Sequence, residues 1–177
     1  IQAGAGFIND INALREPGAL EVAAGFAVPV CLMHMQGEPR TMQEDPRYEN
    51  VVDEVAEFLQ QRITACEQAG VGRERLLLDP GFGFGKTVAH NLYLLQQLNV
   101  LTRLGLPLVV GLSRKSMIAR LLGLEPGERL PASIALAVLA VERGARLVRS
   151  HDVAATWQAL QMAVALHTIK SEQRESL

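Results

Sequence analysis

Five short apolar runs, each followed by a helical pattern, constrain the fold of this chain more than any other feature. They occupy residues 7–8, 29–33, 76–78, 107–112 and 147–148. The longer runs are apolar at consecutive positions, which is typical of strands buried on both faces of a parallel sheet. Strand and helix alternate five times, with an extra helix after the fourth strand. This pattern predicts an α/β fold.

Helices are expected where apolar residues recur every three or four positions, or where capping residues stand at the ends of a segment. The expected helices span residues 17–25, 48–66, 92–101, 113–122, 131–141 and 153–164. Ser113 is the expected N-cap of the helix over 113–122, and Gly123 is expected to end it. The polar tail from Ser171 onward is expected to fray.

Two architectures accommodate this alternation: an open doubly wound sheet and a (β/α)8 barrel of the TIM type. A barrel usually takes roughly 200 residues or more, whereas this chain has 177. Its first residues, Ile1, Gln2 and Ala3, contain neither an initiator methionine nor the start of a strand or helix. We therefore expect a single, incomplete barrel domain over residues 1–177 that lacks about three N-terminal βα units.

Charge and composition argue against several kinds of partner. The net charge is −2, so no basic surface is expected to bind nucleic acid or an anionic membrane. No apolar run approaches the ~18 residues of a membrane-spanning helix, and no secretion signal is recognised, so a cytoplasmic setting is expected. Cys31 and Cys66 have no metal-binding or redox spacing and are expected to be reduced, buried packing residues.

Polar residues follow each of the five apolar runs. They are Asn9 and Asp10, His34, Asp79, Ser113 with Arg114 and Lys115, and Arg149 with His151 and Asp152. In parallel α/β folds the carboxyl ends of the strands lie on one face, and that face holds the active site. Five strands in a row that end in this way predict one polar site.

The residue types at these ends suit a particular ligand chemistry. An ionised Asp79 can accept two parallel N–H bonds and Asn9 offers both a donor and an acceptor, which suits a flat heterocycle with an amino-amide edge. Lys115 can pair with a ring oxygen or nitrogen. Arg149 and His151, two residues apart, suit a phosphate. The glycine loop at residues 81–85 lets a planar ligand pack against Phe84.

Several of these residues also have a purely structural interpretation. Asp79 before Pro-Gly is often a turn former, Lys115 could be a solvated lysine in a first helical turn, and His34 could be a satisfied core histidine. Arg149 and Asp152 could form a surface pair. The same holds for Asp10, which could cap the next segment, and for His90 and His167, expected on helix surfaces.

Two nucleotide-binding motifs and a zinc site are not present. Gly85-Lys86-Thr87 fits the end of a P-loop, but the first glycine of that motif would fall on Pro80. The glycines of the loop are spaced G-x-G-x-G rather than the G-x-G-x-x-G of dinucleotide-binding folds. No His, Cys or carboxylate spacing supports zinc.

Taken together, the motifs resemble those of bacterial dihydropteroate synthases. They are Asn-Asp-Ile at 9–11, Leu-Met-His-Met-Gln-Gly at 32–37, Asp-Pro-Gly-Phe-Gly-Phe-Gly-Lys at 79–86, Ser-Arg-Lys-Ser at 113–116 and Arg-Ser-His-Asp at 149–152. The resemblance implies a (β/α)8 barrel, usually a homodimer. It also implies the Mg²⁺-dependent condensation of 6-hydroxymethyl-7,8-dihydropterin diphosphate with 4-aminobenzoate to dihydropteroate and diphosphate, in folate biosynthesis.

The resemblance also assigns roles by position. It implies pterin contacts at Asn9, Asp79, Lys115 and Arg149, pocket walls at Ile11, Met33, Phe84 and Gly111, diphosphate contacts at Arg149 and His151, and 4-aminobenzoate contacts at Phe84, Lys115 and Ser116. Lys115, Arg149 and His151 are the implied catalytic residues. No metal ligand is implied within this chain, because the family's magnesium ligand lies in its N-terminal part.

The family's N-terminal part, with its two mobile loops, has no counterpart in these residues, so the polypeptide alone is expected to be weakly active or inactive. One alternative is the pterin-binding domain of a folate-dependent methyltransferase, which needs neither the 113–116 nor the 149–152 motif. Another is a non-catalytic fragment. The expected helix over 131–141 is apolar on all sides, which favours burial against a dimer partner or under the final helix.

Overall fold

The five apolar runs form one parallel sheet in the computed structural model, which describes the backbone of residues 1–175 and the side chains of residues 1–166. Its strands are β1 (Ile8–Asp10), β2 (Val30–Met33), β3 (Leu76–Asp79), β4 (Leu108–Val110) and β5 (Ala145–Val148). They lie side by side in chain order, and each neighbouring pair is parallel. A doubly wound sheet reverses its strand order part-way, whereas a barrel steps in one direction, so the order matches the barrel.

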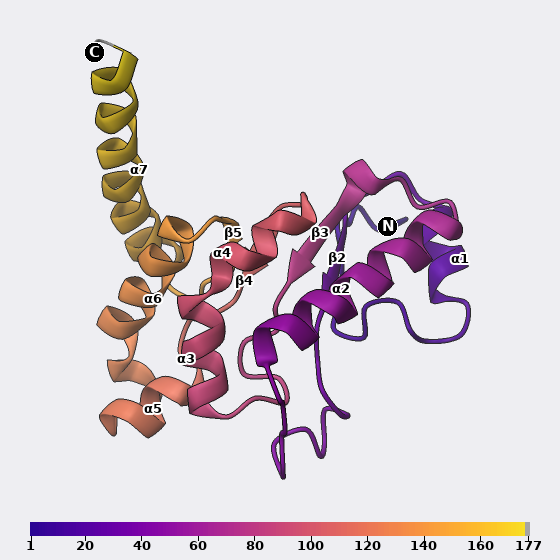
Figure 1. Ribbon diagram of the computed structural model, residues 1–177, viewed down its shortest axis with the longest axis horizontal. Helices are drawn as coiled ribbons and strands as arrows, with labels where there is room; N and C mark the ends of the chain where they lie inside the picture. The colour runs from indigo at the N-terminus through magenta and orange to yellow at the C-terminus, as the bar shows by residue number, and fades with distance from the viewer. Residues whose placement is uncertain (176–177) are drawn as a thin grey trace.

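The helices follow the expected alternation with adjusted bounds. They are α1 (Ala19–Ala24), α2 (Val51–Gln68), α3 (Val88–Gln96), α4 (Leu98–Leu101), α5 (Ser116–Leu122), α6 (Leu130–Glu142) and α7 (Val153–Glu175), with 3-10 turns at Arg73–Arg75, Thr102–Leu104 and Pro126–Glu128. In Figure 1, α2, α3 and α4 cover one side of the sheet, and α7 projects beyond the rest of the chain.

The core lies between the sheet and these helices. Val30 and Leu32 of β2 pack into the same buried cluster as Leu59 and Ile63 of α2. Successive side chains of a strand point to opposite faces, so Cys31 and Met33 face the other side of the sheet, where they are also buried. Cys31 and Cys66 are free and buried, as expected.

The structure corrects the expected start of the helix over 92–101. The Thr87 hydroxyl accepts a hydrogen bond from the His90 amide at 3.1 Å, and the His90 ring accepts one from the Thr87 amide at 3.3 Å. This capping box starts α3 at Val88, and the helix is interrupted at Gln97 before α4 begins. His90 is thus a half-buried capping residue rather than a free surface one, and its ring lies 4.9 Å from that of Tyr48.

Ser113 is not an N-cap, and the C-terminal helix is longer than expected. Arg114 adopts a left-handed conformation with φ of 56°, so α5 starts only at Ser116, with Lys115 at the N-cap position. The α7 backbone continues through Ser171, where fraying was expected. The expectation for His167 concerns a side chain outside the described residues.

The apolar helix over 131–141 is confirmed as α6, and it packs against α7. Its small residues Ser133, Ala137 and Ala140 are buried. Burial under the final helix therefore accounts for part of its apolar surface. Leu139 on α6 and Trp157 on α7 remain 42% and 62% exposed. Within the described residues, no helix is both long enough and apolar enough to cross a membrane.

Candidate active site

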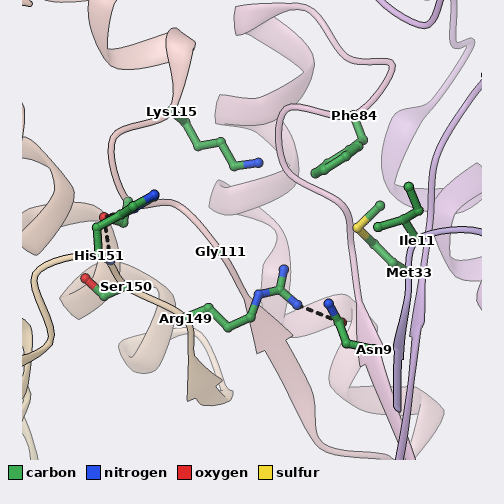
Figure 2. Close-up of a pocket in the computed structure, with 10 residues that line it drawn as sticks. Asn9, Ile11, Met33, Phe84, Gly111, Lys115, Arg149, Ser150 and His151 are labelled. Carbon is green, nitrogen blue, oxygen red and sulfur yellow. Dashed lines mark hydrogen bonds between the residues drawn. The ribbon is translucent and has the colours of Figure 1, made fainter. Parts of the chain in front are cut away.

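A cavity of about 350 Å³ opens at the carboxyl ends of the strands (Figure 2). It is lined by Asn9, Ile11, Met33, Phe84, Gly111, Ser113, Lys115, Arg149, Ser150 and His151. Of the strand-end residues that the sequence grouped, five meet at this cavity: Asn9, Ser113, Lys115, Arg149 and His151. Four others do not line it: Asp10, His34, Arg114 and Asp152. Asp79, which the sequence also placed in the site, does not line the cavity but contacts Arg149, which does. Ser116 is exposed at the start of α5 and does not line the cavity.

Asp79 and Arg149 form the centre of this site. Arg149 donates from Nη2 to the Asp79 carboxylate at 2.5 Å and from Nη1 to the Asn9 side-chain oxygen at 3.0 Å. The other Asp79 oxygen accepts the Gly81 amide at 2.8 Å. Asp79 thus forms the turn after β3 and lies behind Arg149, which lines the cavity while Asp79 itself does not. The suggested surface pair of Arg149 with Asp152 is wrong, because Arg149 points inward.

Gly111 leaves room for the Arg149 guanidinium. A Cβ at position 111 would lie 3.0 Å from Arg149 Nη2, with more of the guanidinium within 3.6 Å. Any larger residue would push the guanidinium from its place over the end of β4. This close approach explains why glycine, rather than another apolar residue, follows the strand.

Lys115 lies on the opposite side of the cavity from the Arg149–Asn9 pair (Figure 2). Its ammonium stands 4.4 Å above the centre of the Phe84 ring, within range of a cation–π contact. Burial lowers the pKa of Lys115, and the Asp79 carboxylate acts in the opposite direction. The interpretation of Lys115 as a solvated lysine is therefore wrong.

The ends of β4 and β5 are tied to one another beside the cavity. The Ser113 hydroxyl accepts the His151 amide at 3.2 Å and lies 3.0 Å from His151 Nδ1. Arg114 donates twice to the Asp152 carboxylate, at 3.0 and 2.6 Å. These contacts hold the His151 ring at the rim of the cavity. Ser113 contacts Nδ1, so Nε2 is the ring nitrogen that does not face Ser113. Sequence reasoning grouped Ser113 with the strand ends but assigned it only a capping role.

Asp10 and His34 have structural roles, as their alternative interpretations predicted. The Asp10 carboxylate accepts the Asn12 and Leu14 amides at 3.1 and 2.7 Å, and so holds the segment after β1. His34 is buried and contacts Lys86 Nζ through Nδ1 at 2.9 Å. Lys86 is 2% exposed, and the sequence did not single it out as a site residue.

We expect His34 to make the stability of the fold depend on pH. Burial, reinforced by the Lys86 charge, lowers the pKa of His34 to about 3, so between pH 6.5 and 3 the unfolded chain binds a proton that the folded chain does not. The free energy of unfolding should therefore fall as the pH drops below 6.5, by up to about 1.4 kcal/mol per pH unit. Urea unfolding at pH 5.0 to 6.5 measures this slope, below the range in which Lys86, whose pKa burial lowers to about 7, changes its charge.

The matched variant for this experiment is His34→Gln, whose side-chain oxygen can still accept from Lys86. Its stability should vary less with pH over the same window, because the titrating group is gone. Equal slopes for the two proteins would show that His34 does not resist protonation in the fold.

The residues of this cavity do not by themselves form a magnesium site. Mg²⁺ prefers carboxylate and other oxygen ligands, but no Asp or Glu is among the residues that line the cavity, and the nearby Asp79 carboxylate is paired with Arg149. Among the described side chains, no group of three His, Cys, Asp or Glu residues could hold a metal ion.

Comparison with known proteins decides the family. The profile of the family described as "Pterin binding enzyme" matches residues 1–151. This chain belongs to the pterin-binding enzyme family. A dihydropteroate synthase of Escherichia coli strain K12 is 52% identical to it over 173 residues, covering 98% of this chain and 61% of that protein. The resemblance inferred from the motifs is thus confirmed.

Solved structures of this pterin-binding family give the same result. The Yersinia pestis dihydropteroate synthase in a sulfonamide drug complex superposes with a TM-score of 0.92 at 49% identity, over 94% of this chain and 61% of that one. A Xanthomonas albilineans dihydropteroate synthase in complex with 7,8-dihydropteroate gives a TM-score of 0.88 at 51% identity, over 94% and 62%. The chain therefore spans about three-fifths of these relatives' length, and its sheet is part of a barrel of their type.

Proposed function

We propose that this chain is the part of a dihydropteroate synthase that binds the pterin, the diphosphate and one edge of the 4-aminobenzoate site. The observation that supports this most directly is the buried Asp79 carboxylate, which is bonded to Arg149 at the cavity wall, with Asn9 bonded to the same guanidinium. This arrangement offers hydrogen-bond acceptors and a donor for a flat amino-amide edge, and cations for a diphosphate.

In this proposal the pterin exchanges places with the Arg149 guanidinium at Asp79. The Arg149 side chain is 38% exposed, whereas that of Asp79 is 1% exposed, so the arginine is the partner that can move. Its guanidinium plane can then stack on the heterocycle or pair with the diphosphate. The carboxylate, held by the Gly81 amide, keeps its position to accept the pterin N–H groups.

The proposed reaction is displacement of diphosphate from the pterin methylene by the aromatic amine. The C–O bond to diphosphate breaks and its electron pair leaves with the diphosphate, beside Arg149 and His151. The amine nitrogen of 4-aminobenzoate then forms the C–N bond and releases a proton. The site needs to position the two substrates and stabilise charge, with no nucleophile of its own.

Magnesium and the oligomeric state belong to this proposal as well. Because the cavity residues do not fit a magnesium site, a Mg²⁺ ion would be held through the diphosphate oxygens, and the steps above do not depend on it. The exposed apolar side chains of α6 and α7, Leu139 and Trp157 among them, support a homodimer through these helices. Light scattering on the purified chain measures its mass.

The experiment that tests the proposed function is calorimetric titration of the chain with 6-hydroxymethyl-7,8-dihydropterin diphosphate and, separately, with 5-methyltetrahydrofolate. Binding of the diphosphate ester, weakened when the diphosphate is removed, supports the synthase. Preference for the methylated folate favours the methyltransferase-type domain, which requires no site for diphosphate. Binding of neither ligand contradicts the proposed function.

We expect Lys115→Met to weaken pterin diphosphate binding by about tenfold. The variant keeps the side-chain length that packs on Gly83, but it removes the ammonium that faces Phe84 and the cavity. A charge-assisted hydrogen bond contributes about 1.5–3 kcal/mol. Calorimetry measures the change, with Arg120→Met on the exposed side of α5 as the control. Equal affinities for the Lys115 variant and the parent would place the lysine outside the ligand contacts.

A further inference from the structure

The glycine loop after β3, residues 81–85, is held in place by side chains from outside it. A loop with glycine at alternate positions has many accessible conformations, but here its polar backbone groups are bonded one after another. The Asn91 side chain accepts the Gly83 amide at 2.7 Å, and the Tyr48 hydroxyl donates to the Gly85 carbonyl at 2.7 Å. The loop is therefore a fixed support for Phe84.

Lys86 makes the central contacts under this loop. Its ammonium donates to the Gly81 carbonyl at 3.0 Å and to the Phe84 carbonyl at 3.1 Å, and lies 2.9 Å from His34 Nδ1. An ammonium has three protons, and this position offers three acceptors. The two carbonyls lie at the start of the loop and at the residue whose ring forms the cavity wall.

Removing the Lys86 ammonium from water costs free energy, and its hydrogen bonds to the loop and to His34 must offset that cost. Burial lowers the pKa of Lys86 to about 7, while the Asp79 carboxylate acts in the opposite direction. His34, whose pKa is lowered to about 3, remains unprotonated and so keeps its nitrogen available to Lys86 near neutral pH. Neither Lys86 nor His34 lines the cavity, and the Lys86 ammonium is occupied by His34 and by two loop carbonyls, so these two residues act on the loop and not on a substrate.

We propose that Lys86 is a positioning residue: by tying the Gly81 and Phe84 carbonyls to His34, it fixes the glycine loop and thereby sets the Phe84 ring and the Lys115 ammonium above it for the aromatic amine substrate. This inference rests on the proposed function. The proposed pterin contacts Asn9 and Arg149 lie on other strands, outside the glycine loop, and do not depend on Lys86. Loss of Lys86 should disturb the aromatic amine more than the pterin.

The first test needs no ligand. In Lys86→Met, which replaces the ammonium by an apolar group of similar length, amide hydrogen exchange at Gly83 and Phe84 should accelerate at least tenfold while amides in β2 and α2 stay protected. Leu59→Ala, in the α2 core, is the control for general loss of stability. Unchanged loop protection in Lys86→Met, or equal acceleration throughout the chain, overturns the proposal.

The second test is a double-variant cycle on ligand binding. With pterin diphosphate present, Lys86→Met should weaken 4-aminobenzoate binding about tenfold and pterin diphosphate binding less than threefold. In a Phe84→Ala background, Lys86→Met should have no further effect on 4-aminobenzoate, because the lysine acts through the ring. Equal weakening of both ligands, or additive effects of the two substitutions, overturns the proposal.

A milder variant covers the case in which Lys86→Met does not fold. Tyr48→Phe deletes only the hydroxyl that donates to the Gly85 carbonyl. It should also weaken 4-aminobenzoate binding more than pterin diphosphate binding, by a smaller factor than Lys86→Met. Loss of pterin affinity instead of aromatic amine affinity overturns the proposal. If the parent chain binds neither ligand, the proposed function fails, and the exchange experiment still decides whether Lys86 fixes the loop.

Discussion

Asp79→Asn should reduce the affinity of this chain for pterin diphosphate at least 100-fold. The carboxylate accepts hydrogen bonds only, as the two N–H groups of a pterin edge require, whereas an asparagine replaces one acceptor by a donor and removes the charge. Hydrogen bonds to charged groups contribute about 1.5–3 kcal/mol each. A mismatch between hydrogen-bonding groups in a buried site weakens binding strongly, because the polar groups are left unpaired. Calorimetric titration measures the change.

Two controls isolate the contact with the ligand. Asp152→Asn removes a carboxylate that pairs with Arg114 at the rim of the same face, and it should change the affinity less than threefold. Thermal unfolding of both variants shows whether loss of the Arg149 partner has altered the fold. A folded Asp79→Asn protein with unchanged affinity would mean that the pterin edge is read elsewhere, and the proposed function would lose its main support.

The location of the site followed from the sequence because it depends on local pattern. Asn9, Asp79 and Arg149 each follow an apolar run, and parallel strands must bring such positions to one edge. The sequence did not show which of these side chains pair with one another. Asp79 and Arg149 are 70 positions apart, and nothing local distinguished this contact from a pair between Arg149 and its near neighbour Asp152. Partner choice depends on the strand register and on the space left by Gly111.

Lys86 shows a second limit of sequence reasoning. A lysine after a glycine-rich segment is typical of an exposed loop or a phosphate site, and lysine is rarely buried. Its burial depends on acceptors from the loop and from His34, which lies 52 positions earlier. Ser113 and Thr87 are similarly both good N-cap residues by type. Thr87 caps α3, whereas the left-handed Arg114 delays the start of α5, so Ser113 is not its N-cap. Tertiary contacts decide such choices.

Gly81→Ala should destabilise the fold severely, because three separate contacts meet at this glycine. Its amide holds Asp79 and its carbonyl accepts from Lys86. A Cβ at position 81 would lie only 1.8 Å from the His34 carbonyl oxygen, and the backbone has φ of +70°. A left-handed conformation costs a residue with a side chain about 1–2 kcal/mol. Relief of the clash requires β3 and the segment after β2 to separate.

We therefore expect a loss of more than about 4 kcal/mol of stability, or no folded protein at all, with the pterin site lost in either case. The matched control is Gly70→Ala, where φ is +86° but a Cβ would meet nothing within 4 Å. That variant has the same backbone strain without the clash, and it should lose only about 1–2 kcal/mol. Urea unfolding of the two variants, followed by circular dichroism, separates the two causes. Similar losses for both would show that β3 and the segment after β2 can separate at little cost, and that the turn that holds Asp79 is less rigid than its contacts indicate.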